Sequence, residues 1–213
     1  MSRFTAALGA GALGVGVLWL GGAFAGGSSF DPPTVAAPPP PTGLEEAILA
    51  SGCFWCAETD FEGVPGVRSV ESGYAGGAEK GPTYHQVSSG TTGHAEAIRV
   101  VYDPAQVSYR QLLDHWARHT DIFDGGGQFC DRGRQYRPVV FPRGDAQRAE
   151  AQALETALEG RFRKPVAFTV EEPGPFWLAE DYHQDFHTKS PARYRSYRAG
   201  CGRDARVRAI WGG

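Results

Sequence analysis

Two cysteines three positions apart, Cys53 and Cys56, lie where a short apolar run meets a segment without glycine or proline. The run Ala47–Ala50 is typical of a buried strand, and residues 54–62 are typical of a helix. Cys53 is therefore predicted at the N-terminus of a helix. Unpaired backbone N–H groups there favour a thiolate, the form of cysteine that attacks sulfur. Cys56 follows one turn later on the same face, close enough to form a disulfide with an oxidised Cys53.

Two other interpretations of the cysteines stay open. Both members of the pair could be small buried side chains, although the intervening Phe54 and Trp55 favour an apolar wall beside a reactive thiolate. The chain has four cysteines, so two structural disulfides are possible in an oxidising compartment. Zinc is disfavoured because Cys130 and Cys201 stand alone, without a histidine at ligand spacing. We predict no metal and no cofactor.

The first 25 residues have the features of an export segment. Arg3 is the only charged residue before Asp31, residues 4–25 are apolar, and Ala23-Phe24-Ala25 has the small-x-small form of a cleavage site. An uncleaved membrane anchor is the alternative, because this run is long enough to span a bilayer. We predict a signal peptide or membrane anchor in residues 1–25, a Pro-rich linker in residues 26–45, and a domain in residues 46–213 that is exported, to the periplasm.

Composition limits the class of protein. With 213 residues, of which 41% are hydrophobic and 21% charged, the chain is long enough for one globular domain. The formal net charge of −3 gives no basic bias, so nucleic acid is not an expected partner. The Arg-rich tail from Arg193 to Arg208 contains aromatic and small residues as well. It is expected to pack against the domain.

The pattern of apolar residues predicts an α+β fold. The expected order is β-α-β-β-α-β with an appended helix and strand, which is that of a ferredoxin-like split βαβ sandwich. In the last helix, Asp145 is a candidate N-cap and Gly160 a candidate stop. From residue 171 onward we expect a long, irregular tail that wraps the domain as loop and short helix. The predicted strands are 46–50, 67–74, 96–102, 138–141 and 166–170, and the predicted helices are 54–62, 108–119 and 145–159.

Three polar clusters could surround Cys53 in such a fold. Tyr84 lies in a loop, Glu96 begins a strand, and Asp131 and Tyr136 belong to a glycine-dense segment that suits a binding loop better than a simple connection. By residue type alone, Tyr84 and Tyr136 could equally be ordinary half-buried tyrosines, and Glu96 could equally be a solvated acid at the end of a strand.

Four fragments, in this order, resemble the methionine sulfoxide reductase A family of peptide-methionine (S)-S-oxide reductases: GCFWC, GPTYHQVSSGTTGHAEA, FCDRGRQYRP and FWLAEDYHQDF. The resemblance covers residues 46–213. It implies thiol-dependent reduction of the S epimer of methionine sulfoxide in oxidised proteins or peptides. It further implies thioredoxin or a thioredoxin-like protein as reductant, and we expect a monomer.

The resemblance also assigns roles. Cys53 would attack the sulfoxide sulfur, Phe54 and Trp55 would receive the substrate methyl group, and Glu96 would donate a proton to the sulfoxide oxygen. Attack builds negative charge on that oxygen, so donors are needed there. Three more residues would bind the sulfoxide oxygen or hold the site: Tyr84, Tyr136 and Asp131.

The resolving cysteine differs from the common family pattern. Many members have glycine where this chain has Cys56 and use a cysteine near the C-terminus, for which Cys201 is the candidate here. A second thiol must condense with the sulfenic acid left on Cys53. Cys56 is preferred because Cys201, between Gly200 and Gly202, would have to travel. Cys130 is expected to be structural. The rival function is a thioredoxin-like dithiol-disulfide oxidoreductase, which assigns no role to Glu96.

Overall fold

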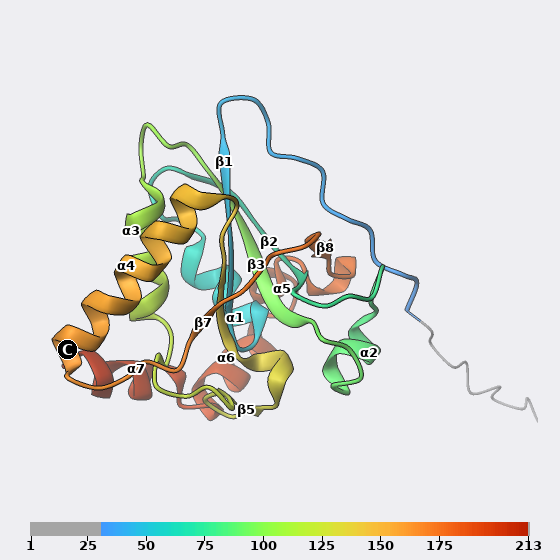
Figure 1. The fold of residues 1–213 in the computed structure, drawn as a ribbon. Helices are drawn as coiled ribbons and strands as arrows, with labels where there is room; N and C mark the ends of the chain where they lie inside the picture. Colours follow the sequence, from blue (N-terminus) through green and yellow to red (C-terminus); the bar gives the residue numbers. More distant parts are fainter. Residues whose placement is uncertain (1–30, 213) are drawn as a thin grey trace, which may run out of the picture. The chain divides into compact units, whose positions relative to one another are not determined.

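A computed structural model describes residues 31–212, which form a mixed α+β domain around one sheet (Figure 1). The sheet has six strands in the order β7-β6-β1-β3-β2-β8. These strands are β1 (Glu45–Ser51), β2 (Val67–Ala75), β3 (Ala95–Tyr102), β6 (Pro138–Phe141), β7 (Thr169–Val170) and β8 (Trp177–Leu178). A separate two-stranded hairpin consists of β4 (Gly127–Gln128) and β5 (Asp131–Arg132).

The helices include long elements between strands and a C-terminal group. They are α1 (Phe54–Phe61), α2 (Tyr84–Ser88), α3 (Tyr109–Arg118), α4 (Asp145–Phe162), α5 (Phe186–Lys189), α6 (Pro191–Gly200) and α7 (Arg203–Trp211). Two 3₁₀ turns, η1 (Arg134–Tyr136) and η2 (Asp181–His183), connect elements near the site.

The strand pairing places β3 between β1 and β2. Both neighbours pair with β3 in antiparallel register, so β1 and β2 run parallel and α1 connects them. β1 likewise pairs antiparallel with β6 and separates it from β3, and α3 lies in the chain between β3 and β6. The predicted α+β class is confirmed, with the first five long predicted elements present close to their expected bounds.

The sheet buries both faces. Alternation along β1 sends Ala47 and Leu49 to the core beneath α1, α3 and α4, and sends Ile48 and Ala50 to the opposite face. That second face is covered by extended chain, including Phe176. Burial on both faces explains why the short strand β1 is a continuous apolar run.

The Pro-rich stretch from residue 31 onward contacts the domain. The Thr34 hydroxyl donates to the Pro82 carbonyl at 2.7 Å, and the Arg99 guanidinium donates to the Pro38 carbonyl at 2.8 Å. Arg99 is buried and also pairs with Glu46 at 2.5 Å. The described part of this stretch is therefore extended chain fastened to the sheet. The predicted export segment, residues 1–25, lies outside the described residues, and within 31–212 no helix is long and apolar enough to cross a membrane.

The predicted start of the last predicted helix at Asp145 is confirmed, but its predicted N-cap and its predicted end were wrong. Gly144, not Asp145, is the N-cap of α4, and the helix passes through Gly160 to end at Arg163 in the left-handed conformation. Phe162, in the turn beyond Gly160, packs edge-on against Phe123 and Trp211, and such aromatic contacts oppose the cost of about 1 kcal/mol for glycine in a helix. The strand predicted for 166–170 shortens to β7.

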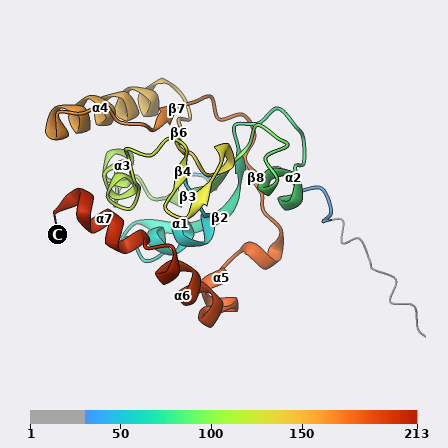
Figure 2. The ribbon, with the colours of Figure 1, turned by 90° about the horizontal axis from the view of Figure 1, so that it is seen from below.

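The C-terminal tail, predicted to be irregular with loop and short helix, contains three helices along one side of the domain (Figure 2). Arg203 anchors them. Its buried guanidinium donates to the carbonyls of Ser51 at 2.9 Å and His119 at 2.8 Å, and lies 3.2 Å from Asp60. Packing of the Arg-rich tail against the domain is confirmed. These contacts hold the tail beside the start of α1.

Candidate active site

Cys53 lies at the junction between β1 and α1. Gly52 adopts φ +81°, and a Cβ at this position would lie 2.5 Å from Cβ of Gln128, so only glycine fits the turn. Cys53 is the N-cap residue of α1 and is 7% exposed. The predicted helix-start position is confirmed.

The thiol of Cys53 is not activated by its position alone. Burial raises its pKa well above the usual value, and the hydrogen bond to Cys56 and the charge of Glu96 add to this. The Phe54 N–H at the helix start is already donated to Glu96 Oε2, at 3.1 Å. The expectation that the helix N-terminus would favour the Cys53 thiolate was therefore wrong for the substrate-free site, because burial outweighs the dipole.

Cys56 lies one turn further along α1, buried and free, as is Cys53. Its pKa is lowered, first by a hydrogen bond from the Cys53 thiol and then by the positive charges of Arg203 and Arg198. The two thiols titrate as a pair, and the first proton lost leaves a thiolate to which the other thiol donates.

Glu96 is a buried carboxyl group directed at the start of α1. It is on β3, is 2% exposed, and accepts the Phe54 N–H. Burial raises its pKa to about 8, and the neighbouring charge of Asp131 acts in the same direction. Glu96 is consequently protonated at neutral pH and can deliver a proton.

Two tyrosines provide further donors. Tyr84 begins α2 and is held by its backbone N–H, which donates to Glu180 Oε1 at 2.7 Å. Burial raises the pKa of Tyr84 to about 12 and that of Tyr136, at the end of η1, still higher. Both hydroxyls therefore keep their protons at neutral pH.

Asp131 reaches the site from β5 and is met there by a residue that the sequence analysis missed. Tyr197, on α6, donates its hydroxyl proton to Asp131 Oδ2. Burial raises the pKa of Asp131. The only signal for Tyr197 in the sequence is its place among the aromatic residues of the Arg-rich tail, which does not specify a contact with Asp131.

A small cavity of about 60 Å³ joins these groups. It is large enough for a few water-sized atoms. Seven of the nine predicted site residues line it, together with Tyr197: Cys53, Phe54, Trp55, Tyr84, Glu96, Asp131 and Tyr136. The other two predicted residues, Cys56 and Cys201, do not line the cavity.

Trp55 forms a rigid aromatic wall. Its ring stacks on Phe186 with centroids 3.6 Å apart, and its Nε1 donates to His183 Nδ1 at 3.0 Å. Burial lowers the pKa of His183 to about 4, so its ring is neutral and its Nδ1 can accept this hydrogen bond. His183 and Phe186 were not predicted as site residues, although both belong to the fourth fragment that carried the resemblance.

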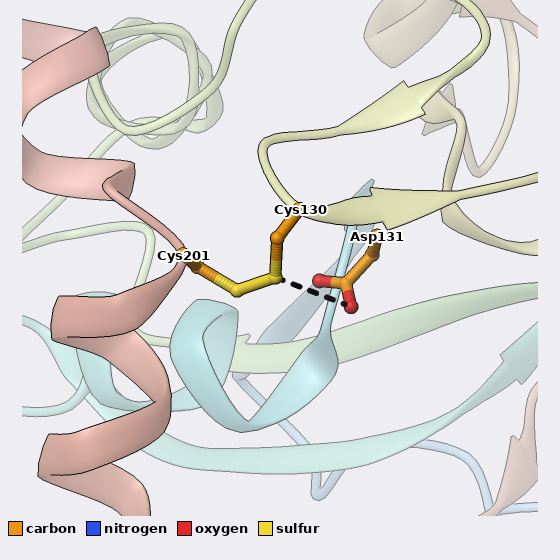
Figure 3. A group of neighbouring side chains, drawn as sticks. All are labelled: Cys130, Asp131 and Cys201. Carbon is orange, nitrogen blue, oxygen red and sulfur yellow. Dashed lines mark hydrogen bonds between the residues drawn. A yellow bond between two sulfur atoms is a disulfide. The ribbon is translucent and has the colours of Figure 1, made fainter.

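Cys201 is bonded to Cys130 in a disulfide (Figure 3). Cys201 follows α6 as its C-cap residue, and Cys130 precedes Asp131 at the tip of the β4–β5 hairpin. In this state neither sulfur is a thiol, so neither can ligate a metal as a thiolate. Within residues 31–212, Cys53 and Cys56 are the free cysteines.

Comparison with known proteins places this geometry in a family. Residues 45–213 match the family model described as peptide methionine sulfoxide reductase. The chain belongs to this family. A relative named peptide methionine sulfoxide reductase MsrA 2, from Caulobacter vibrioides, is 50% identical over 182 residues, which are 85% of this chain and 90% of the relative.

Solved structures agree with the peptide methionine sulfoxide reductase assignment. Methionine sulfoxide reductase A of Corynebacterium diphtheriae is 29% identical, with a TM-score of 0.64 over 75% of this chain and 86% of that one. The reduced form of Mxr1 from Saccharomyces cerevisiae is 28% identical, with a TM-score of 0.68 over 73% and 90%. The predicted family and enzyme class are confirmed, and the rival dithiol-disulfide oxidoreductase is set aside.

Proposed function

We propose that this peptide methionine sulfoxide reductase reduces the S epimer of methionine sulfoxide in oxidised proteins and peptides. The observation that carries the proposal is the buried, protonated Glu96 beside Cys53 in a cavity with the hydroxyls of Tyr84 and Tyr136. A thiol nucleophile next to a neutral carboxyl group and two neutral hydroxyls suits a substrate whose oxygen gains charge during attack.

In the proposed first step, the Cys53 thiolate attacks the sulfoxide sulfur and Glu96 gives its proton to the sulfoxide oxygen. The protonated oxygen then moves from the substrate sulfur to the Cys53 sulfur as the transient bond between the two sulfurs breaks, so methionine leaves and Cys53 is left as sulfenic acid. Phe54 and Trp55 supply the apolar surface for the substrate methyl group. The hydroxyls of Tyr84 and Tyr136 hydrogen-bond the oxygen while its charge develops.

The second step needs a thiol, and we propose that Cys56 supplies it. Cys56 is free and one helical turn from Cys53, whereas Cys201 is bonded to Cys130. Condensation of the Cys56 thiol with the Cys53 sulfenic acid forms a disulfide and releases water. A dithiol reductant then returns both cysteines to thiols. Cys201 is the alternative resolver if its bond to Cys130 has first been reduced.

We expect one turnover without reductant to leave a Cys53–Cys56 disulfide. Replacement of Cys201 by serine should still give this disulfide, whereas Cys56→Ser should accumulate sulfenic acid because the free neighbouring thiol is gone. Peptide mapping of the oxidised protein, with a trap for sulfenic acid, measures both. A Cys53–Cys201 bond as the first product, formed at the parental rate in Cys56→Ser, would contradict the assignment.

The activity itself is tested with S and R epimers of a methionine sulfoxide peptide and dithiothreitol as reductant. Turnover of the S epimer alone supports the proposal. Turnover of neither epimer, with reduction of insulin disulfides instead, would support the rival oxidoreductase.

Location and reductant belong to the same proposal. The apolar residues 4–25, which end with Ala23-Phe24-Ala25, favour export. An exported enzyme needs electrons from thioredoxin or a thioredoxin-like protein on its own side of the membrane. We further propose that the enzyme acts as a monomer. The intact mass of the mature protein distinguishes cleavage after Ala25 from a retained anchor.

A further inference from the structure

An open groove lies close to the active-site cavity. It holds about 600 Å³, which is within the size range of sites that bind small molecules and peptide side chains. The groove is lined by the Pro-rich chain at Pro32 and Val35 and by apolar residues of two strands, Val70 on β2 and Leu178 on β8. Among residues 31–212, the side chains that line it include several acids and no lysine or arginine.

The Pro-rich chain is fixed in place at this groove. The Leu178 N–H donates to the Val35 carbonyl at 2.9 Å, and the Ala37 N–H donates to the Phe176 carbonyl at 2.8 Å. β8 in turn pairs with β2 in antiparallel register. Because backbone hydrogen bonds join all three segments, the groove is a built feature of the domain.

Two large hydrophobic side chains are exposed at the groove. Val35 is 65% exposed and Tyr182 is 49% exposed, and both line it. They are the most exposed large hydrophobic side chains within residues 31–212. Scattered exposed apolar residues need no explanation, but exposed apolar surface gathered at one groove indicates a binding surface.

Acidic side chains accompany this apolar surface. The side chain of Asp181 is 99% exposed, although Lys189 Nζ lies 3.5 Å from its Oδ2, and Asp185, the N-cap residue of α5, is exposed as well. Lysine and arginine match such a surface, because their aliphatic stems pack on apolar groups while their charged ends reach the polar rim. Opposite charge on the partner also favours its encounter with the groove.

The groove and the active-site cavity share neighbouring residues. Glu180 lines the groove, and its Oε1 accepts the backbone N–H of Tyr84, which lines the cavity, at 2.7 Å. The ring of Tyr182 lies 4.2 Å from that of His183, measured between centroids, and His183 accepts the Trp55 N–H. A peptide whose methionine sulfoxide occupies the cavity can therefore place residues next to it in the groove.

We propose that this groove binds the segment of an oxidised protein beside the methionine sulfoxide and selects segments that carry a lysine or arginine there, an inference that rests on the proposed function. The aliphatic stem of that residue packs against Val35 and Tyr182. Its charged end pairs with the carboxylates of Asp181 and Asp185. The favoured substrates are thus basic segments of proteins and peptides, because free methionine sulfoxide is too small to reach the groove.

The experiment compares peptides that share one methionine S-sulfoxide and differ in the residues on either side of it, which are lysine, glutamine or glutamate. Turnover is measured as kcat/KM of the full chain with dithiothreitol, and binding as fluorescence anisotropy of labelled peptides on Cys53→Ser. We expect the lysine peptide to exceed the glutamate peptide about 5-fold in both, since each exposed charge pair contributes modestly. Salt at 1 M should remove most of this ratio, because the Debye length falls to about 3 Å.

The double variant Asp181→Asn/Asp185→Asn removes the two exposed carboxylates. Asparagine suits position 185, where φ is +51°, a conformation that Asn and Asp both adopt. The ratio of lysine to glutamate peptide should fall close to 1. The matched control is Asp114→Asn/Glu150→Gln, which removes two exposed carboxylates of α3 and α4 that do not line the groove. It should keep the parental ratio.

The outcomes separate the groove from the proposed function. Equal affinities for the lysine and glutamate peptides overturn the groove as a substrate site, and residues 1–30 or a second copy of the chain seated in it would give this result. A ratio that persists in Asp181→Asn/Asp185→Asn, or that falls equally in the control, overturns it as well. In each case turnover of S-sulfoxide peptides by the parent upholds the proposed function.

A parent that turns over none of the peptides overturns the proposed function instead. The affinities measured on Cys53→Ser do not depend on turnover. Their ratio then still decides whether the groove recognises a basic segment.

Discussion

Replacement of Cys53 by serine is expected to abolish methionine formation, even with an excess of small-molecule thiol. Serine at this position keeps the helix start but cannot supply a thiolate, and it leaves no sulfur at the cavity. Cys56 does not line the cavity, and Cys130 and Cys201 are bonded to each other, so none of them replaces the attacking atom. The measurement is single-turnover formation of methionine from an S-sulfoxide peptide.

The matched control is Cys56→Ser, which removes the neighbouring thiol instead. It should still form up to one equivalent of methionine, because the first step needs only Cys53. Methionine formation by Cys53→Ser in a single turnover would refute the assignment of the nucleophile.

Glu96→Gln is expected to slow the first chemical step by about 10²-fold or more, within the usual range for general acid catalysis. Glutamine keeps the shape and can accept the Phe54 N–H, but it has no acidic proton to deliver. In the parent, the rate of this step should fall as pH rises through about 8, where Glu96 loses its proton. Glu96→Gln should lack that decline.

Glu58→Gln is the control for this substitution. Glu58 is also buried, on α1, and its pKa is raised to about 7, but it does not line the cavity. The first chemical step in the Glu58→Gln variant should stay close to the parental rate. A Glu96→Gln variant as fast as the parent across neutral pH would reduce Glu96 to a structural acid at the start of β3.

The substitution Glu96→Gln should also raise the free energy of unfolding at high pH. The pKa of Glu96 is about 8 in the fold against 4.5 outside it, so the folded state binds the proton more tightly. The stabilisation of the folded state by this proton is fully present below pH 4.5 and is lost as pH rises through about 8. At about 1.4 kcal/mol for each pH unit between the two values, the loss is roughly 5 kcal/mol at most. Denaturant unfolding of Glu96→Gln should show a gain over the parent at pH 9 and little difference at pH 4. Equal stabilities at pH 9 would contradict the raised pKa.

Local sequence determined where the reactive cysteine lies. The apolar run of β1, the glycine at 52 and the unbroken segment after it specify a strand, a turn with positive φ and a helix, each from short-range preferences. Phe54 and Trp55 follow at fixed spacing, so their place beside Cys53 is set by the helix itself. For Tyr84, Glu96, Asp131 and Tyr136, pattern alone suggested candidates, and the family fragments chose among the alternatives.

Tertiary structure decided the protonation of these groups. The helix N-terminus suggested a Cys53 thiolate, yet burial under distant segments raises its pKa, and the N–H that would have helped is bound to Glu96 on β3. Burial likewise turns Glu96 from an ordinary acid into a proton donor at neutral pH. Desolvation depends on all the chain that covers a group, which a local pattern does not contain.

Tertiary structure also decided which cysteines pair and which tail residues reach the site. Cys130 and Cys201 are separated by 71 positions, and Arg203 bonds to Ser51 across 152. The sequence determined that a thiol, aromatic rings and an acidic side chain would lie together at the start of α1. The hydrogen bond of Tyr197 with Asp131 was decided by the packing of α6, because contacts between segments so far apart in sequence depend on how the whole domain folds.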